Sequence, residues 1–271
     1  MGVMELIKVK NASFHYEKTE VFNDLSLKLN AGQVLCLIGS NGCGKTTLLD
    51  CILGIKKLRK GEILINGVNI SKLKASQRAR EICYVPQFHR GTFPYKVLEI
   101  VVMGRAVYTG FFHMPSQKDI CIAMEALEMV GMDQYKDKPY TELSGGEVQL
   151  VMIARAMAQN ASIIIMDEPT SHLDMRHELI VLENIVKLVK DKGKAVIIAT
   201  HAPNHAFHFE NHNIATSVAL MRDGGFIDYG KPKDVVNEVN LDKLYKVKTK
   251  IVDVEVDNCY TMKQILPLKS S

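Results

Sequence analysis

The chain has 271 residues, a formal net charge of +4 at pH 7 and 47% hydrophobic residues, which fits one large globular domain or two modest ones. The charge is small and dispersed, and the one dense basic run, Lys56–Lys60, is interpreted as a solvated helix end, so the composition does not favour a nucleic-acid-binding protein. No run approaches the roughly 18 apolar residues of a membrane helix, no secretory signal is visible, and the six cysteines lack a C-x-x-C pair. These features predict a cytosolic protein with reduced thiols.

The first part of the chain alternates short β-branched runs with turns. Its predicted strands are Ile7–Asn11, Val34–Ile38, Gly61–Ile65 and Ile82–Val85. After residue 86 the pattern becomes helical, and Ser116 is the predicted N-cap of a helix over Gln117–Val130.

Residues 161–230 return to a strand–helix–strand order, with a predicted helix over Met175–Lys192 between two apolar strands. This order predicts an α/β core that is interrupted by a helical subdomain at about residues 88–159. Residues 236–271 are predicted to form a charge-rich C-terminal tail with weak strand signals.

A phosphate-binding loop is predicted between the strand Val34–Ile38 and a helix over about Thr46–Leu53. The loop comprises Gly39, Ser40, Asn41, Gly42, Cys43, Gly44, Lys45, Thr46 and Thr47. Its glycines let backbone N–H groups point inward, and the helix directs its positive end at the same point. Lys45 adds a charge for the β and γ phosphates, and the Thr46 hydroxyl is a hard oxygen suited to Mg²⁺. At Cys43 the backbone N–H is expected to matter more than the side chain, so the residue is interpreted as a tolerated variable position. The alternative is a reactive thiol, because a helix N-terminus lowers a thiol pKa and alkylation of Cys43 could block ATP binding.

An acidic pair follows the apolar run Ser162–Met166, which is predicted to be a strand. Asp167 is expected to hold Mg²⁺ through water. Glu168 is one residue further on and points the other way, so it is the candidate that polarises an attacking water.

These motifs and several others occur in the order and spacing of an ABC-type ATPase, which the chain resembles over roughly residues 3–235. The set consists of Gly39–Thr47, Gln87, Leu143–Glu147, Ile163–Glu168, Ser171–Asp174 and His201. The resemblance implies the α/β class with a P-loop NTPase (RecA-like) core, N-terminal antiparallel strands and an inserted α-helical subdomain. It places the ATPase domain at residues 1–235 and leaves 236–271 as the tail.

The resemblance also implies roles for single residues. Tyr16 resembles the aromatic residue that stacks on adenine, an interaction that tolerates any base. Gln87 resembles the glutamine that reaches Mg²⁺ and the attacking water, and His201 resembles the switch histidine that contacts the γ-phosphate. With Glu168, these two residues form the expected catalytic set.

The segment Leu143–Glu147 resembles the signature motif of the family, which serves a nucleotide held by a second copy of the chain. The residues expected to bind that nucleotide are Ser144, Gly145 and Gly146, and Asp174 of the Ser171–Asp174 motif is also expected to contribute to nucleotide binding. A helix over about Gly146–Gln159 would again direct its positive end at the phosphates. Glu147 stands where many members have glutamine, which puts a negative charge near ATP unless it is paired.

Four histidines, at positions 201, 205, 208 and 212, would lie near one face if Pro203 begins a helix. That face could bind a metal ion, or the histidines could simply pack on a surface helix. His201 is already assigned to the phosphate, and the spacing alone does not decide between the two alternatives for the others.

Three segments, Val102–Arg105, Thr200–Ala206 and Leu241–Tyr245, resemble importer ATPases for iron–siderophore complexes, haem and cobalamin, a group with a molybdate and tungstate branch. The implied cofactors are ATP and Mg²⁺. The implied partners are two polytopic membrane permease subunits, a second copy of the chain and, indirectly, a substrate-binding protein, at the cytoplasmic face of the cell membrane. An exporter ATPase and a soluble ABC protein acting on ribosomes or DNA are the alternatives.

The segment Phe88–Gly110 links Gln87 to the helical subdomain and is rich in apolar residues. Part of it is expected to form a groove for a short helix of the membrane subunit. Arg105 is predicted to be the polar residue nearest that surface, where its charge would contact the partner.

Overall fold

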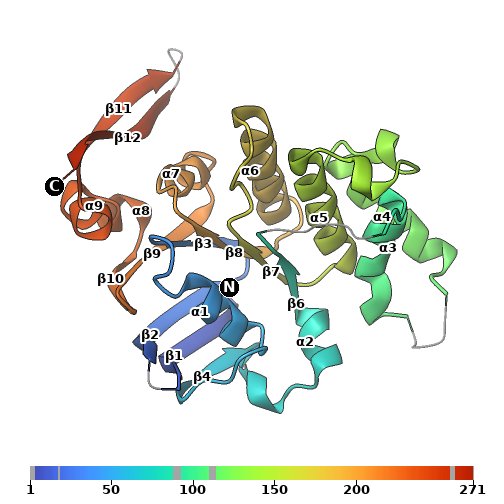
Figure 1. Ribbon diagram of the computed structural model, residues 1–271, viewed down its shortest axis with the longest axis horizontal. Coiled ribbons are helices and arrows are strands. Elements are labelled where there is room, and N and C mark those ends of the chain that lie inside the picture. Colours follow the sequence, from blue (N-terminus) through green and yellow to red (C-terminus); the bar gives the residue numbers. More distant parts are fainter. Residues whose placement is uncertain (1–3, 18, 88–92, 110–113, 257–259, 271) are drawn as a thin grey trace.

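The structure is a computed structural model that describes residues 4–17, 19–87, 93–109, 114–256 and 260–270. A central sheet lies between a layer of helices and a smaller N-terminal sheet (Figure 1). The helices α3 (Val97–Val102), α4 (Gln117–Met129) and α5 (Gly145–Gln159) form a group at one side, and a C-terminal hairpin projects at the other (Figure 1). This arrangement confirms the predicted α/β class, the antiparallel N-terminal strands and the inserted helices.

The central sheet has six strands in the order β10-β9-β3-β8-β7-β6. They are β3 (Gln33–Ile38), β6 (Ile82–Val85), β7 (Ile163–Asp167), β8 (Ala195–Thr200), β9 (Ala215–Arg222) and β10 (Gly225–Gly230). β10 runs antiparallel to β9, and the other pairs are parallel. Both faces of the parallel strands are covered, which explains why they read as continuous apolar runs. Their carboxyl ends meet at one edge, where α/β sheets bind ligands.

The N-terminal sheet is antiparallel with the order β2-β1-β4-β5. Its strands are β1 (Glu5–Tyr16), β2 (Thr19–Asn30), β4 (Lys60–Ile65) and β5 (Val68–Asn69). β1 is much longer than the predicted run Ile7–Asn11, and β2 was not predicted at all. In β2 the buried residues Leu25, Leu27 and Leu29 alternate with exposed polar ones, which is the period of a strand with one face on the core.

The remaining helices are α1 (Lys45–Ile52), α2 (Ala75–Glu81), α6 (Met175–Lys190), α7 (Asn204–Asn211), α8 (Pro232–Val235) and α9 (Glu238–Tyr245). Short 3₁₀ turns occur at Ile70–Lys72, Met103–Val107, Asp133–Tyr135 and Tyr140–Glu142. Ser116 caps α4 as predicted, since its hydroxyl accepts a hydrogen bond from the backbone N–H of Asp119 at 3.3 Å. Within the described part of the chain, no helix is both long and apolar enough to cross a bilayer.

Two apolar clusters lie on opposite faces of the central sheet, and β3 contributes alternately to both. The helix-side cluster contains Val34, Cys36 and Ile38 together with buried residues of α5, α6 and α9. The strand-side cluster contains Leu35 and Leu37 together with buried residues of α1 and the N-terminal sheet. Because successive side chains of a strand point to opposite faces, one strand anchors both layers.

The C-terminal segment is more regular than predicted. β11 (Val247–Val256) and β12 (Tyr260–Ser270) pair as an antiparallel hairpin. The hairpin contacts α7 through a hydrogen bond from the Ile265 N–H to Asn204 Oδ1 at 3.3 Å, and α9 through one from the Ile251 N–H to Glu238 Oε1 at 3.2 Å. Leu241 of α9 is fully buried in the helix-side cluster. The division of the chain at residue 235 stays a prediction.

Arg105 does not lie on the surface, so its predicted contact with a partner is wrong. Its Nε donates to Asp119 Oδ1 at 2.9 Å, and its Nη1 donates to the carbonyl oxygen of Ala158 at 2.8 Å. Its guanidinium also lies 4.1 Å from the ring centre of Tyr108. Arg105 therefore joins α4 to the end of α5, and a lone arginine in the sequence gives no signal of these distant partners.

Candidate functional site

The phosphate loop connects β3 to α1 and leaves the start of that helix open. Gly44 precedes the helix with φ of 107°, a conformation that favours glycine, and no side chain caps the first N–H groups. A Cβ on Gly39 would lie 2.4 Å from the carbonyl oxygen of Met221, so only glycine fits there. Lys45 is buried, and its Nζ donates to the carbonyl oxygens of Gly39 at 2.7 Å and Ser40 at 3.2 Å. The loop thus brings a helix N-terminus and a fixed ammonium group to one point.

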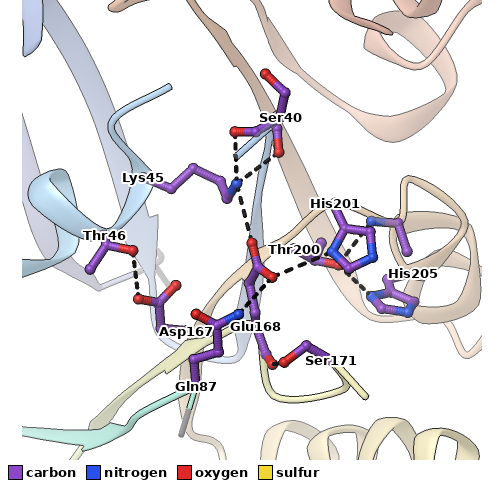
Figure 2. Close-up of polar contacts among 12 residues, drawn as sticks. Ser40, Lys45, Thr46, Gln87, Asp167, Glu168, Ser171, Thr200, His201 and His205 are labelled. Carbon is purple, nitrogen blue, oxygen red and sulfur yellow. Dashed lines mark hydrogen bonds and ion pairs between the residues drawn. The ribbon is translucent and has the colours of Figure 1, made fainter. Parts of the chain in front are cut away.

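Asp167, the last residue of β7, is buried and faces α1. The hydroxyl of Thr46 donates to its Oδ2 at 2.8 Å (Figure 2). Burial raises the pKa of this carboxyl above its ordinary value, and the neighbouring Glu168 charge acts in the same direction. Burial also raises the pKa of Tyr84, to about 12, with the Asp167 charge adding to it. Two hard oxygens, from Asp167 and Thr46, are therefore held in contact at the sheet edge.

Glu168 lies where residues from several strand ends meet (Figure 2). Its Oε1 is 3.4 Å from Lys45 Nζ, while Oε2 accepts from Gln87 Nε2 at 3.2 Å and lies 3.5 Å from His201 Nδ1. Its backbone has φ of 46°, a region that non-glycine residues rarely adopt, and its N–H donates to the carbonyl oxygen of Ala199 at 2.9 Å. A strained backbone fixed by the neighbouring strand directs this carboxylate toward three functional groups.

A cavity of about 370 Å³ opens over these residues. It is lined by Tyr16, Val21, Asn41, Gly42, Gly44, Lys45, Thr46, Thr47, Gln87 and Glu168. Tyr16 is 48% exposed, its ring packs edge-on against Phe14 at 5.0 Å, and Lys56 Nζ lies 5.6 Å from its centre. Val21 was not predicted, because it reaches the cavity only through the pairing of β2 with β1.

The structure contradicts the alternative of a reactive Cys43 thiol. Its side chain is buried in the strand-side cluster, and burial raises the pKa of its thiol. The Lys45 charge lowers that pKa, but it is the smaller effect.

The signature-like segment forms the start of α5. Ser144 is the N-cap, and its N–H and hydroxyl donate to a Glu147 carboxylate oxygen at 2.8 and 2.9 Å. These hydrogen bonds lower the pKa of Glu147, so its charge is paired within its own turn. Gly146 faces the His177 ring, since a Cβ on Gly146 would lie 2.6 Å from an atom of that ring. Asp174 is the N-cap of α6, and its Oδ1 lies 2.9 Å from His177 Nδ1.

The His177 ring thus lies between Gly146 and Asp174 and brings the two segments together. Within the part of the chain that the structure describes, neither segment lines the cavity over the phosphate loop. The roles of Ser144, Gly145, Gly146 and Asp174 stay predictions. His177 was missed, although its position three residues after a helix-capping aspartate is a readable signal.

The four histidines have separate surroundings, and the described residues contain no group of three or more side chains suited to a metal ion. The His201 side chain is 57% exposed beside Glu168. His205 is buried between Thr200 and Glu178, at 3.0 and 2.8 Å. The rings of His208 and His212 lie tilted against each other, with centres 4.4 Å apart.

Comparison with known proteins agrees with this geometry. Residues 22–171 match the family model described as ABC transporter. The molybdate import ATP-binding protein MolC of Haemophilus influenzae is 35% identical over 240 residues, which cover 88% of this chain and 87% of that protein. The iron(3+)-hydroxamate import ATP-binding protein FhuC of Bacillus subtilis is 30% identical over 249 residues, covering 92% and 91%. A solved structure described as a metal-chelate type ABC transporter in an inward-facing conformation is 32% identical, covers 98% of both chains and superposes with a TM-score of 0.86. The chain therefore belongs to the ABC transporter family, among its ATP-binding proteins.

Proposed function

We propose that this chain binds and hydrolyses ATP and thereby powers a membrane importer for iron–siderophore, haem or cobalamin-type metal chelates. The observation that carries the proposal is the position of Glu168. It faces Lys45, Gln87 and His201 beside a cavity that begins at a phosphate loop. A binding module that only held a nucleotide would not need a buried carboxylate at that point.

The residues of the cavity fit ATP with Mg²⁺. The open start of α1 suits phosphates, and Tyr16 offers an exposed ring on which a base can stack. Thr46 and Asp167 supply paired hard oxygens and would hold Mg²⁺ together with Gln87. The bound ion would neutralise charge on the phosphate oxygens.

The protein groups divide the reaction between them. Lys45 compensates the phosphate charge, and the exposed His201 side chain can reach the γ-phosphate. Glu168 accepts the proton of the attacking water while that oxygen forms a bond to the γ-phosphorus and the bond to the ADP oxygen breaks. Gln87 orients the Glu168 carboxylate through its amide hydrogen bond.

The composite site would need a second copy of the chain. Ser144 and Gly146 lie at a helix start outside the cavity of their own chain, where they could meet a nucleotide held by the other copy. Two copies placed head to tail would complete two such sites by a closed twofold arrangement.

A permease would dock on the helical subdomain. An apolar groove of about 580 Å³ is lined there by Tyr95, Leu98, Glu99, Val102, Met103, Ala106, Thr109, Met114, Pro115 and Ile120. Three of its large apolar side chains are exposed, Tyr95, Met103 and Met114, so they form a contiguous apolar surface rather than a single exposed residue. The groove suits a short amphipathic helix, and Gln87 would link it to the ATP site. Of the segment Phe88–Gly110, residues 88–92 and 110 lie outside the described residues, as do Phe111 and Phe112.

The importer and its cargo are inferred from likeness. FhuC and MolC are named for import of iron(3+)-hydroxamate and of molybdate, and both match along nearly the whole chain. Molybdate or tungstate import is the second candidate, and an exporter ATPase and a soluble ABC protein remain the alternatives from other classes.

A complementation experiment tests the composite site. Ser144→Arg should bind ATP as a monomer but neither dimerise nor hydrolyse it, and Lys45→Ala should lose ATP binding. A mixture of the two should regain hydrolysis, because each mixed pair contains one intact site. Lys57→Ala, an exposed lysine in the following loop, is the matched control and should behave as wild type. Loss of ATP binding in the Ser144→Arg monomer would contradict the two-copy site.

A further inference from the structure

The backbone on both sides of the His201 side chain is held by hydrogen bonds, one from α9 and one local. The hydroxyl of Tyr245, the last residue of α9, donates to the His201 carbonyl oxygen at 2.7 Å. On the other side, the N–H of Ala202 donates to Thr200 Oγ1 at 3.0 Å. The His201 side chain itself remains 57% exposed, so its backbone is fixed while its ring is free to reach forward.

The support behind Thr200 continues into α6. Because Thr200 Oγ1 accepts from Ala202, its hydrogen is available for His205 Nδ1 at 3.0 Å. His205 Nε2 then donates to Glu178 Oε1 at 2.8 Å. Thr200 and His205 are both nearly inaccessible, so every buried donor in this chain of contacts has a partner.

Tyr245 approaches from the C-terminal segment, which the sequence analysis left without a function. Its ring packs against the helix-side cluster beside buried Leu241 and Leu244 of the same helix. The following Lys246 has φ of 54°, ends α9 and turns the chain into β11. The hairpin in turn contacts α9 and α7, so the phenol is held in place from behind.

We infer that Tyr245 is a positioning residue for ATP hydrolysis: it fixes the backbone of His201 and so places the imidazole for the γ-phosphate, which makes the C-terminal segment part of the ATPase site. The inference rests on the proposed role of His201. A displacement of a reacting group by about 1 Å can lower a rate by roughly a hundredfold, so a single hydroxyl that fixes this backbone is worth testing.

The test is Tyr245→Phe, which removes one oxygen and leaves the ring in the cluster. We expect kcat for ATP to fall about tenfold while KM changes less than about twofold, because the bond acts on the transition-state contact rather than on nucleotide binding. Tyr229→Phe is the matched control. The Tyr229 hydroxyl also donates to a backbone carbonyl oxygen, that of Lys28 in the N-terminal sheet, at 3.1 Å. Removal of this hydroxyl should leave kcat unchanged.

A double-mutant cycle separates positioning from general support. In the His201→Ala background, measured by single turnover of radiolabelled ATP, Tyr245→Phe should slow hydrolysis no further. An unchanged kcat in Tyr245→Phe, or the same loss with and without His201, overturns the inference. If Lys45→Ala still bound and hydrolysed ATP, the proposed function would fail instead, so the two failures are distinguishable.

Discussion

Replacement of Glu168 by glutamine keeps the size and shape of the side chain and removes its ability to accept the proton of the attacking water. A general base contributes about 10²–10⁴-fold to a rate, so Glu168→Gln should lower kcat by that factor, which corresponds to about 3–5 kcal/mol of activation free energy. ATP binding should remain, because Lys45 keeps its contacts with the loop carbonyl oxygens.

The substitution should also lower the folding stability. The ion pair between Glu168 and Lys45 spans 3.4 Å, and the two side chains are only 9% and 5% exposed. At an effective dielectric constant of about 20 their attraction is about 5 kcal/mol. Glu168→Gln removes only one partner and leaves the Lys45 ammonium buried without its counter-charge, so the free energy of unfolding should fall by about 3–5 kcal/mol.

The assay combines steady-state phosphate release, nucleotide affinity and size-exclusion chromatography. With hydrolysis blocked, the ATP-bound pair should accumulate and elute at twice the monomer mass. Glu183→Gln changes an exposed glutamate of α6 in the same way and should match wild type in all three measurements. Hydrolysis by Glu168→Gln at close to the wild-type rate would refute the assignment of the base.

Two further predictions concern the groove and the histidines. Met103→Glu, in the groove, should leave folding and basal hydrolysis intact and abolish stimulation by the permease in vesicles. Val239→Glu, which lies outside the groove and is also exposed, should keep that stimulation. Arg105→Glu should instead unfold the helical subdomain in thermal denaturation, because the new carboxylate repels that of Asp119. Burial lowers the pKa of His208 to about 4, with His212 and His205 adding to the shift, so the native state binds fewer protons than the unfolded state between about pH 4 and 6.5. Stability should therefore fall as pH falls through that window, and the melting temperature of His208→Gln should depend on pH less steeply; an equal slope in both proteins would contradict this origin.

The convergence of Lys45, Thr46, Gln87, Asp167, Glu168 and His201 could be predicted from the sequence because each motif is local. Lys45 and Glu168 each follow an apolar run, and parallel strands bring their carboxyl ends together whatever the loops between them do. The strand β2 was equally readable, since its leucines alternate with polar residues, and it was missed only because no motif drew attention to it.

Other features depend on contacts that the local sequence does not encode. Arg105 resembles a surface charge until α4 and the end of α5 close around it. Cys43 likewise depends on distant contacts, because it is buried in the strand-side cluster, and this burial raises the pKa of its thiol more than the Lys45 charge lowers it. Tyr245 is 44 residues from its partner His201, and neither side of that pair has a pattern that predicts the other.

The alternation of β3 between two apolar clusters also gives the protein an internal reporter of its own unfolding. Cys36 is buried in the helix-side cluster and Cys51 in the strand-side cluster, while Cys121 is exposed. Burial raises the pKa of both buried thiols, so neither reacts with a thiol reagent while its layer stays closed. The exposed Cys121 gives the labelling rate of an accessible thiol for comparison. In mild denaturant, the labelling rates of Cys36 and Cys51 by a thiol reagent therefore report separately how fast each face of the sheet opens. Equal labelling rates at Cys36 and Cys51 mean that the two layers open as one cooperative unit, and unequal rates identify the layer that opens first.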